Sequence, residues 1–366
     1  MHSSSAHQLL RLTYSNFFRS FIRTKSYMAS NTAAWLPQAK ARPFQIKPAP
    51  LGSPAEGQIL VKNHAIAVNP IDGKLQSRAY YPLNYPVILG EDVAGEVVSV
   101  GAGVDQFNKG DRVLGSAAAF DSKKGDAAAF QEYTILDTHL TSKIPDHISY
   151  ESAVVIPLGF STASAGLFNP DFLNLQLPTH PAQSATGKTL LVWGGASSVG
   201  CNAIQLAVAA GYEVVATASP KNFELIKKLG ASQVFDYNNA TVVEDLVSAF
   251  KGKALVGVYD TIGGPAWAPV FEFIKLVDGN KFVTTVIPGF PDPPEGVRVG
   301  HVYSMSIRNN GIGKAVWTDF LAKALEEGTF FPAPNPLVVG KGLESLQGAV
   351  DVVIKGVSAQ KVVVVL

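Results

Sequence analysis

The sequence of 366 residues contains a single cysteine, Cys201, and few charged residues. One cysteine excludes a disulfide framework, an iron–sulfur cluster held by thiolates and a zinc site built from cysteines. Charged residues make up only 16% of the chain and the formal net charge is +1, which gives no electrostatic case for nucleic acid as a partner. No uncharged apolar run reaches the roughly 20 residues that a membrane-spanning helix needs. What remains is an ordinary globular protein, long enough for two domains.

Acidic residues are missing from the start of the chain, where the first one is Glu56. Residues 1–27 are rich in serine, and their basic residues are Arg11, Arg19, Arg23 and Lys25. An arginine-rich, serine-rich and acid-free segment is typical of an organelle transit peptide. The alternative is that translation begins at Met28. We therefore assign residues 1–28 to an N-terminal extension, and expect a cytoplasmic protein, or a mitochondrial one if residues 1–27 are a transit peptide.

The rest of the chain shows two different patterns of apolar residues and turn residues. From Ala33 to about Ser152, short apolar stretches are separated by Gly, Pro, Asn and Asp, which predicts a β-rich unit with tight, barrel-like turns. From Gly187 onward, strand and helix patterns alternate, which predicts a parallel, doubly wound sheet. The last stretch holds two helical patterns and the strand KVVVVL, which we expect to return to the first unit.

The segment LLVWGGASSVG follows a buried strand and opens a helix, as a dinucleotide-binding turn requires. Aligned as G-x-G-x-x-G, it runs from Gly195 to Gly200 and has Ser197 in place of the second glycine. Ser198 and Val199 complete the turn. The Ser197 hydroxyl could donate to a phosphate oxygen, and Gly200 would let the helix pack on the strand. The alternative is a merely structural turn.

The end of the next strand lacks the acidic residue that NAD sites place about 20 residues after the glycines. Ser219 stands there, and Lys221 and Asn222 follow. A hydroxyl and an ammonium suit a 2′-phosphate, so we predict NADPH, although Lys221 could also be a solvated loop lysine. Tyr237 ends the third strand, where it could cover the adenine, reach the 2′-phosphate or only pack.

Several segments in their order resemble the medium-chain dehydrogenase/reductase superfamily: NPIDGKLQ, LGEDVAGEVVSVGAGVDQFNKGDRVLG, GFSTASAGL, VWGGASSVGCNAIQLA, LGASQVFDY and GVYDTIGG. The resemblance implies an α/β fold with a GroES-like β-barrel domain, residues 29–160 and 316–366. A Rossmann NADP-binding domain, residues 161–315, is inserted between these parts, and the active site lies in the cleft. The chain is most similar to the zinc-free quinone oxidoreductase branch, which includes fungal trans-acting enoyl reductases.

The resemblance also implies that a catalytic zinc is absent. Zinc-dependent members carry Gly-His-Glu where this chain has Gly90, Glu91 and Asp92. Two adjacent carboxylates do not supply the N and S ligands that zinc prefers. We expect Asp92 to anchor its loop through backbone N–H groups, and Glu91 to border the cleft.

Without a Lewis acid, hydride addition to an activated C=C is easier than alcohol oxidation. We therefore predict NADPH-dependent reduction of a hydrophobic enone, enoyl substrate or quinone. The alternatives are a zinc-free alcohol or aldehyde dehydrogenase, and a non-catalytic NADPH-binding scaffold or sensor. The sequence does not distinguish a monomer from a homodimer. The segment HVYSMSI is a candidate edge strand through which a dimer could form.

The resemblance places further residues around the reacting atoms. It implies that Asn69 to Asp72 lie along the nicotinamide, with Thr162 near its ribose or the substrate carbonyl. Lys74 could stabilise an enolate or supply a proton, or it could be an exposed strand-end lysine. The rival proton donors are Tyr81, Tyr80 and Tyr133. Val286 and Ile287 are expected to line the nicotinamide pocket, or to be ordinary core. The loop SAAAFDSKKGDAAAFQEY could border a hydrophobic channel or be plain surface.

Overall fold

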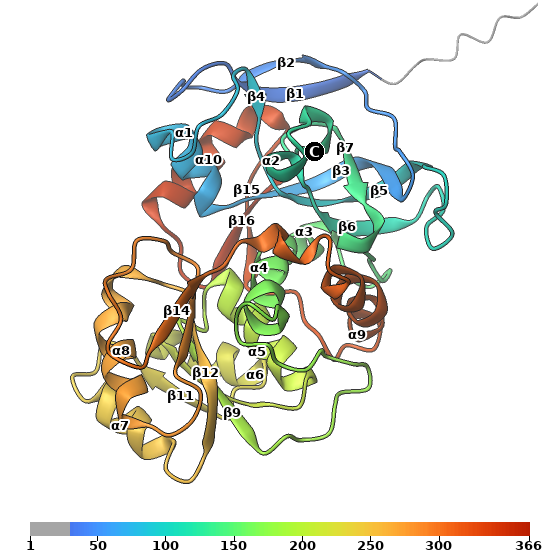
Figure 1. Cartoon of the computed structure of the whole chain (residues 1–366). Coiled ribbons are helices and arrows are strands. Elements are labelled where there is room, and N and C mark those ends of the chain that lie inside the picture. Colours follow the sequence, from blue (N-terminus) through green and yellow to red (C-terminus); the bar gives the residue numbers. More distant parts are fainter. Residues whose placement is uncertain (1–29) are drawn as a thin grey trace, which may run out of the picture.

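The computed structural model describes residues 30–366 (Figure 1). The transit peptide or late start expected at residues 1–28 lies outside the described residues. Figure 1 shows two units, one made of the blue to teal-green parts of the chain together with the red strands and helix at its end, and the other of the light green, yellow and orange parts. The red C-terminal part therefore lies with the N-terminal part, as predicted. The predicted limits of the two domains stay predictions at the level of single residues.

The first unit is built on a seven-stranded sheet in the order β15-β16-β3-β5-β6-β8, with β7 paired to β3. Strand β3 (Gln58–Val68) is central, and β16 (Gln360–Val365) pairs with it antiparallel. The KVVVVL strand thus closes the first unit, which confirms its predicted return. The remaining strands of this sheet are β5 (Asp92–Val100), β6 (Arg112–Ser116), β7 (Tyr133–Asp137), β8 (Thr141–Lys143) and β15 (Asn335–Lys341).

A second, three-stranded sheet covers this unit in the order β2-β1-β4. Its strands are β1 (Asn31–Leu36), β2 (Gln45–Ala49) and β4 (Val87–Ile88). Short helices fill the connections: α2 (Ala119–Ser122), the 3-10 turns Gly125–Ala127 and Thr138–Leu140, and α3 (Tyr150–Ala153). The helix α10 (Leu346–Lys355), preceded by the 3-10 turn Leu343–Ser345, packs on α1.

Helix α1 (Pro70–Arg78) is a correction to the β-rich prediction. Its first turn carries a helix-start signal, because Pro70 is at the first position and Asp72 at the third. The Asp72 carboxylate accepts a hydrogen bond from the Asn69 N–H at 2.8 Å. Lys74 therefore lies on a helix and not at the end of a strand.

The second unit is a parallel six-stranded sheet in the order β11-β10-β9-β12-β13-β14. In chain order this is 3-2-1-4-5-6, the doubly wound dinucleotide-binding topology, whose order reverses between β9 and β12. The strands are β9 (Lys188–Trp193), β10 (Glu213–Ala218), β11 (Gln233–Asp236), β12 (Ala254–Asp260), β13 (Phe282–Thr285) and β14 (Arg298–His301). Only His301 of the predicted edge segment HVYSMSI belongs to the edge strand, and the segment continues into a 3-10 turn, Ser304–Ile307.

Alternate residues of the central strand β9 enter different cores, because successive side chains point to opposite faces of a strand. Leu190 packs in a core that includes α5 (Ser198–Ala209), whereas Leu191 packs in one with the helices on the other face. Those helices are α7 (Val242–Ala249) and α8 (Trp267–Leu276), and α6 (Phe223–Lys228) lies beside α5. Helices on both faces confirm the predicted doubly wound sheet.

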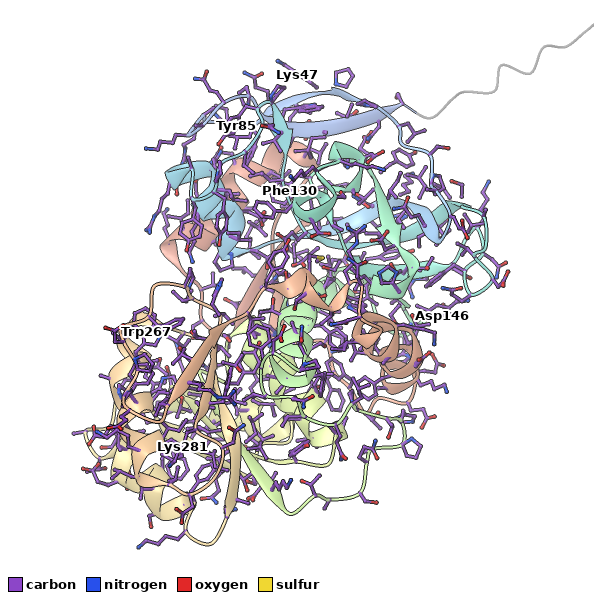
Figure 2. All side chains as sticks on the ribbon, in the orientation of Figure 1. Lys47, Tyr85, Phe130, Asp146, Trp267 and Lys281 are labelled. Carbon is purple, nitrogen blue, oxygen red and sulfur yellow. The ribbon has the colours of Figure 1, made fainter. Side chains whose placement is uncertain are left out.

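Helix α4 (Pro157–Phe168) lies at the junction of the two units and packs against α5. The segment Tyr150–Phe168 has the length and apolarity of a membrane span, but 78% of its most apolar window is buried inside the protein, as in a core helix. Figure 2 shows side chains filling the space around this junction, between Phe130 above and Trp267 below. After β14 the chain forms a π-helical segment, Lys314–Leu321, that continues into α9 (Ala322–Glu326), where one helix was predicted.

Candidate active site

The turn after β9 is shaped by a glycine and by two hydrogen bonds of one serine side chain. Gly194 has a φ of +84°, and a Cβ there would lie 2.4 Å from Ile262, so this position requires glycine. The predicted pattern started one residue later and missed it. Ser197 accepts a hydrogen bond from the Gly200 N–H at 2.9 Å and donates one to the Thr261 hydroxyl at 2.9 Å. The hydroxyl that was expected to face a phosphate is therefore already used as the cap of α5.

The start of α5 fits the pyrophosphate of a dinucleotide. A Cβ on Gly200 would lie 2.4 Å from the Gly194 carbonyl oxygen, so glycine allows the close approach of the helix, which is made to the turn after β9 and not to the strand as predicted. The first N–H groups of a helix have no intrahelical partner and attract anions. Ser198 and Val199 lie in this first turn, and within residues 30–366 the buried Ser198 hydroxyl has no hydrogen-bond partner.

Four predicted cofactor residues come together at the ends of β10 and β11. The Ser219 and Tyr237 hydroxyls are 2.7 Å apart. Lys221 is exposed in the short turn Pro220–Asn222, and the Asn222 amide donates to the Ser358 hydroxyl at 3.4 Å. The structure thus joins the two hydroxyls, and the chain places Lys221 and Asn222 directly after Ser219, so donors that suit a phosphate lie on this edge.

Two residues that the sequence reasoning missed hold the loop on the other side of the turn. Asp260 is fully buried and accepts from the Ile262 N–H, the Gly263 N–H and the Thr285 hydroxyl. The Thr261 hydroxyl contacts the Trp193 and Gly194 carbonyls at 2.9 and 2.8 Å. An Asp-Thr pair directly after a buried strand was the available signal.

Val286 and Ile287 follow β13 at the same edge of the sheet. Ile287 packs on Gly263, where a Cβ would lie 2.6 Å from the Ile287 Cβ. Val286 is partly buried against the core around α4 and α5. They border the carboxyl ends of the strands, where ligands of open α/β sheets bind.

Thr162 lies on α4 and is 9% exposed. Its hydroxyl donates to the Leu158 carbonyl at 2.7 Å, and its own carbonyl accepts from the Tyr259 hydroxyl at 2.6 Å. The hydroxyl predicted to meet the nicotinamide ribose or the substrate is therefore bonded within its own helix. The backbone of α4 is in turn tied to β12 of the parallel sheet.

We expect Tyr259→Phe to lower the free energy of unfolding by about 1 to 3 kcal/mol, because it leaves the Thr162 carbonyl buried without that donor. Urea denaturation measures the difference. The matched control is Tyr85→Phe, since the buried Tyr85 hydroxyl has no partner in the described part of the chain. That variant should be neutral or slightly stabilised. Equal effects in the two variants would contradict the assignment of the Tyr259 bond.

A buried polar cluster lies where zinc-dependent relatives carry their metal ligands. Asp92 is 0% exposed, and its carboxylate is 2.8 Å from the Lys361 ammonium and 2.9 Å from the Asn69 amide. Its other oxygen accepts from the Leu158 N–H at 2.7 Å. Asp92 was expected to bond N–H groups of its own loop, but it caps the first turn of α4, which has unpaired N–H groups and a positive dipole end.

Lys361 is the residue of this cluster that sequence reasoning missed. It is 4% exposed and also donates to the Asn69 side chain. It is the charged residue at the start of an otherwise apolar strand, KVVVV, which was the available signal. The Asn69 amide nitrogen donates to Asp92 on β5, and its amide oxygen accepts from Lys361 on β16. Asn69 therefore joins both strands to the start of α1.

Asp72 and Glu91 add two more carboxyls to this cluster. Burial, more than the neighbouring Asp92, raises the pKa of Asp72 to about 7. Burial, followed by the charges of Asp72 and Asp92, raises the pKa of Glu91 to about 8. One ammonium faces three carboxyls, so these two hold protons more readily than ordinary acids.

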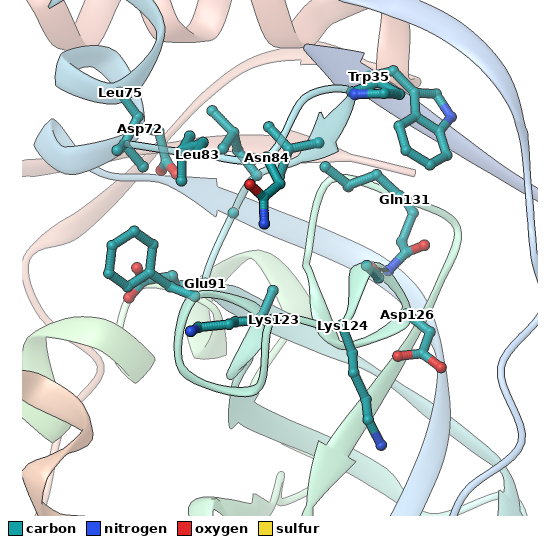
Figure 3. Close-up of a pocket in the computed structure, with 18 of the residues that line it drawn as sticks. Trp35, Asp72, Leu75, Leu83, Asn84, Glu91, Lys123, Lys124, Asp126 and Gln131 are labelled. Atoms are coloured by element: carbon teal, nitrogen blue, oxygen red, sulfur yellow. Dashed lines mark hydrogen bonds between the residues drawn. The ribbon is translucent and has the colours of Figure 1, made fainter. Parts of the chain in front are cut away.

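A pocket of about 690 Å³ opens beside this cluster (Figure 3). Glu91 and Asp72 lie on its wall, together with apolar side chains and the segment 119–131. The apolar residues are Trp35, Leu75, Leu83, Val87, Ile88, Leu89 and Phe120. The loop predicted either to border a hydrophobic channel or to be plain surface therefore borders a pocket.

The predicted catalytic residues do not line this pocket. Lys74 lies beside a smaller hollow of about 210 Å³ between α1 and α10, with its ammonium 5.5 Å from the centre of the Tyr80 ring. Burial, followed by Arg78, lowers the pKa of Lys74. Tyr81 packs against Tyr80 and against Phe120, whose ring does line the larger pocket. Tyr81 thus lies at the margin of that pocket and Lys74 outside it.

Two families match the chain: "Alcohol dehydrogenase GroES-like domain" over residues 55–146 and "Zinc-binding dehydrogenase" over residues 198–308. The zinc-binding alcohol dehydrogenase domain-containing protein cipB of Emericella nidulans is 53% identical over 92% of this chain and 98% of its own length. The chain belongs to the medium-chain dehydrogenase/reductase superfamily. It is therefore an oxidoreductase of this type.

Two further members are similar along nearly the whole chain. The trans-enoyl reductase himH of Aspergillus japonicus is 41% identical over 91% of this chain and 97% of its own length. The quinone oxidoreductase of Escherichia coli, solved in complex with NADPH, has a TM-score of 0.68 at 20% identity and covers 92% of this chain and 100% of its own. The second likeness shows the fold alone.

A zinc ion does not fit the residues at the position implied by the family description. Glu91 stands at the histidine position, and the neighbouring side chains are carboxylates, an amide and an ammonium. In the part of the chain that the structure describes, no group of three His, Cys, Asp or Glu residues is placed to hold a metal ion. Lys361 would also repel a cation there.

Proposed function

We propose that this oxidoreductase uses NADPH to reduce the activated double bond of a hydrophobic enone or enoyl substrate, or a quinone, without zinc. The observation that carries the proposal is the apolar pocket with two proton-holding carboxyls, Asp72 and Glu91, where relatives place a metal. Carbonyl reduction needs an electrophile to stabilise an alkoxide, whereas a conjugated system spreads the charge that hydride brings. The printed name of the relative himH supports the same class of reaction.

NADPH supplies the hydride when it is bound, and the protein's residues orient it. The first turn of α5 would hold the pyrophosphate. Ser219, Lys221, Asn222 and Tyr237 would hold the 2′-phosphate, and the loop after Asp260 would form the wall of the nicotinamide site with Val286 and Ile287. An acidic residue, Asp236, also lies at the end of β11 near these groups, but its carboxylate accepts a hydrogen bond from the Asn238 N–H in its own turn. The pocket of the first unit would hold the substrate.

The test is NADPH oxidation by the purified protein across a panel of enones, quinones, enoyl thioesters and aldehydes, with product analysis. Reduction of the double bond with the carbonyl retained is expected. Formation of an alcohol as the main product would favour a zinc-free alcohol or aldehyde dehydrogenase. NADPH binding without turnover of any substrate would point to a scaffold or sensor. Metal analysis of the same sample should find no stoichiometric zinc.

We expect Lys221→Ala to raise the KM for NADPH about tenfold and to leave the KM for NADH nearly unchanged, because a charge-assisted contact to phosphate is worth about 1.5 to 3 kcal/mol and less when exposed. Steady-state kinetics with both cofactors give the ratio. The control is Lys251→Ala, an exposed lysine distant from the ends of β10 and β11 in the sequence. A Lys221→Ala variant with unaltered NADPH preference would contradict the 2′-phosphate assignment.

A further inference from the structure

The Glu91 carboxyl has no structural partner. Its backbone carbonyl accepts from the Ala117 N–H at 2.7 Å, but within residues 30–366 its carboxyl oxygens form no hydrogen bond or ion pair. The ammonium of this cluster, on Lys361, is taken by Asp92 and Asn69. Glu91 is half-buried, and its side chain lines the pocket. Its carboxyl is therefore free to contact a molecule in the pocket.

Burial, followed by the charges of Asp72 and Asp92, raises the pKa of Glu91 to about 8, and the titratable groups that face it come from several elements. They are Asp72 on α1, Asp92 on β5, Lys361 on β16, Tyr303 after β14, and Lys123, Lys124 and Asp126 on the pocket segment 119–131. Among these cations Lys361 alone is buried, and its charge is balanced by Asp92. The two pocket lysines are exposed to solvent. The carboxyls thus outnumber the buried cations around Glu91, and the protonated form is favoured.

Glu91 is close enough to Tyr303 for its ionised form to raise the pKa of that hydroxyl, after burial and Asp121. Tyr303 belongs to the chain directly after the edge strand β14. Tyr303 also donates to Asp121 on α2 at 3.4 Å, so this wall of the pocket is joined to the second unit. Glu91 is therefore near the junction at which a nicotinamide and a substrate would meet.

We propose that the Glu91 carboxyl delivers the proton that completes the α-carbon of the substrate after hydride addition, an inference that rests on the proposed ene reduction. Hydride, with its electron pair, forms the new C–H bond at the β-carbon, and the C=C electrons move to give the enolate. The Glu91 O–H bond then breaks as the α-carbon takes the proton. The Glu91 carboxylate is reprotonated from water, so each turnover consumes one NADPH and one proton.

The other candidate acids are less suitable. The Thr162 hydroxyl donates to the Leu158 carbonyl, and Lys74 lies beside a different hollow. Asp72 lines the pocket, but its carboxylate holds the first turn of α1 through the Asn69 N–H. Asp126 also lines the pocket without a hydrogen bond or ion pair to its carboxyl among the described residues, but Figure 3 shows it beside Lys124 on the opposite side from Asp72 and Glu91. Glu91 is therefore the remaining acid that lines the pocket near the polar cluster and forms no other bond among the described residues.

The experiment compares Glu91→Gln with wild type in NADPH-dependent reduction of an enone bearing an α-methyl group and of a quinone. General acid catalysis contributes about 100- to 10,000-fold, so kcat for the enone should fall at least about 100-fold. Quinone reduction should fall far less, because its product oxygen takes a proton from water. The α-methyl product of wild type should be a single enantiomer, and that of the variant a mixture. The control is Glu272→Gln, an exposed residue on α8.

The pH profile of wild type gives an independent measurement that does not depend on the variant folding. Activity needs protonated Glu91, so kcat for the enone should fall as the pH rises through about 8, and quinone reduction should not follow it. A Glu91→Gln variant with wild-type enone rate and stereochemistry overturns the inference. So does a wild-type profile that is flat from pH 7 to about 9. Wild-type protein that reduces only quinones also overturns it, whereas turnover of neither substrate overturns the proposed function itself.

Discussion

Replacing Lys361 with methionine is expected to lower the free energy of unfolding by about 3 to 5 kcal/mol, because it leaves a buried carboxylate without its ion-pair partner. Asp92 is 0% exposed and Lys361 is 4% exposed, and their charged atoms are 2.8 Å apart. Methionine has nearly the same length as lysine, so little packing is lost. Urea denaturation monitored by tryptophan fluorescence measures the change.

The matched control for this prediction is Lys355→Met on the exposed end of α10, where the change should stay within about 0.5 kcal/mol. Adding Asp92→Asn to Lys361→Met should recover part of the loss, since no unpaired charge then remains buried. If Lys361→Met costs less than about 1 kcal/mol, the pair contributes little, as exposed pairs do.

The parts of the fold that the sequence predicted correctly are those with a strong local pattern. The alternation of strands and helices after Gly187 determined the parallel sheet, because each βα unit buries one helical face on its neighbours. The apolar strand at the C-terminus had to be buried, and it closes the first unit. Helix α1 was missed although its start signal was present. The strand patterns on both sides of it led us to interpret the whole region as β-rich.

The candidate site was only partly predictable, because its polar cluster joins residues that are far apart in the chain. Asn69, Asp92 and Lys361 are within hydrogen-bonding distance, yet no local pattern relates the last to the first two. Likewise, the Ser197 hydroxyl was expected to face a phosphate, but Thr261, on a different strand end, takes its hydrogen. Residue types at motif positions predict the location of the site, whereas hydrogen-bond partners depend on the tertiary structure.

The Glu91–Asp92 pair illustrates the same limit. From the sequence, this pair only argued against a catalytic zinc, because it lacks the histidine that a zinc site needs. In the structure the two neighbours point into different surroundings. Asp92 is bonded to α4, Asn69 and Lys361, whereas the Glu91 carboxyl faces the pocket and has no partner among residues 30–366. Two adjacent carboxyls therefore take different roles, one structural and one proposed to be catalytic.

Replacing Gly200 with alanine is expected to weaken NADPH binding about 10- to 100-fold, because a Cβ there would lie 2.4 Å from the Gly194 carbonyl oxygen and 2.8 Å from the Gly195 Cα. These are backbone atoms of the turn and cannot rotate away as a side chain does. The strain of overpacking, about 1 to 3 kcal/mol, moves α5 away from the turn that would hold the pyrophosphate. NADPH titration monitored by fluorescence measures the affinity.

The same substitution at Gly348 separates this clash from the general effect of removing a glycine from a helix. Gly348 is exposed on α10, and a Cβ there would meet no heavy atom within 4 Å. Gly348→Ala should therefore stabilise the fold by about 0.5 to 1 kcal/mol and leave NADPH affinity unchanged. If Gly200→Ala behaves like Gly348→Ala in both measurements, the close approach of α5 to the turn is not what binds the cofactor. Loss of affinity in Gly200→Ala alone would place the pyrophosphate at the start of α5.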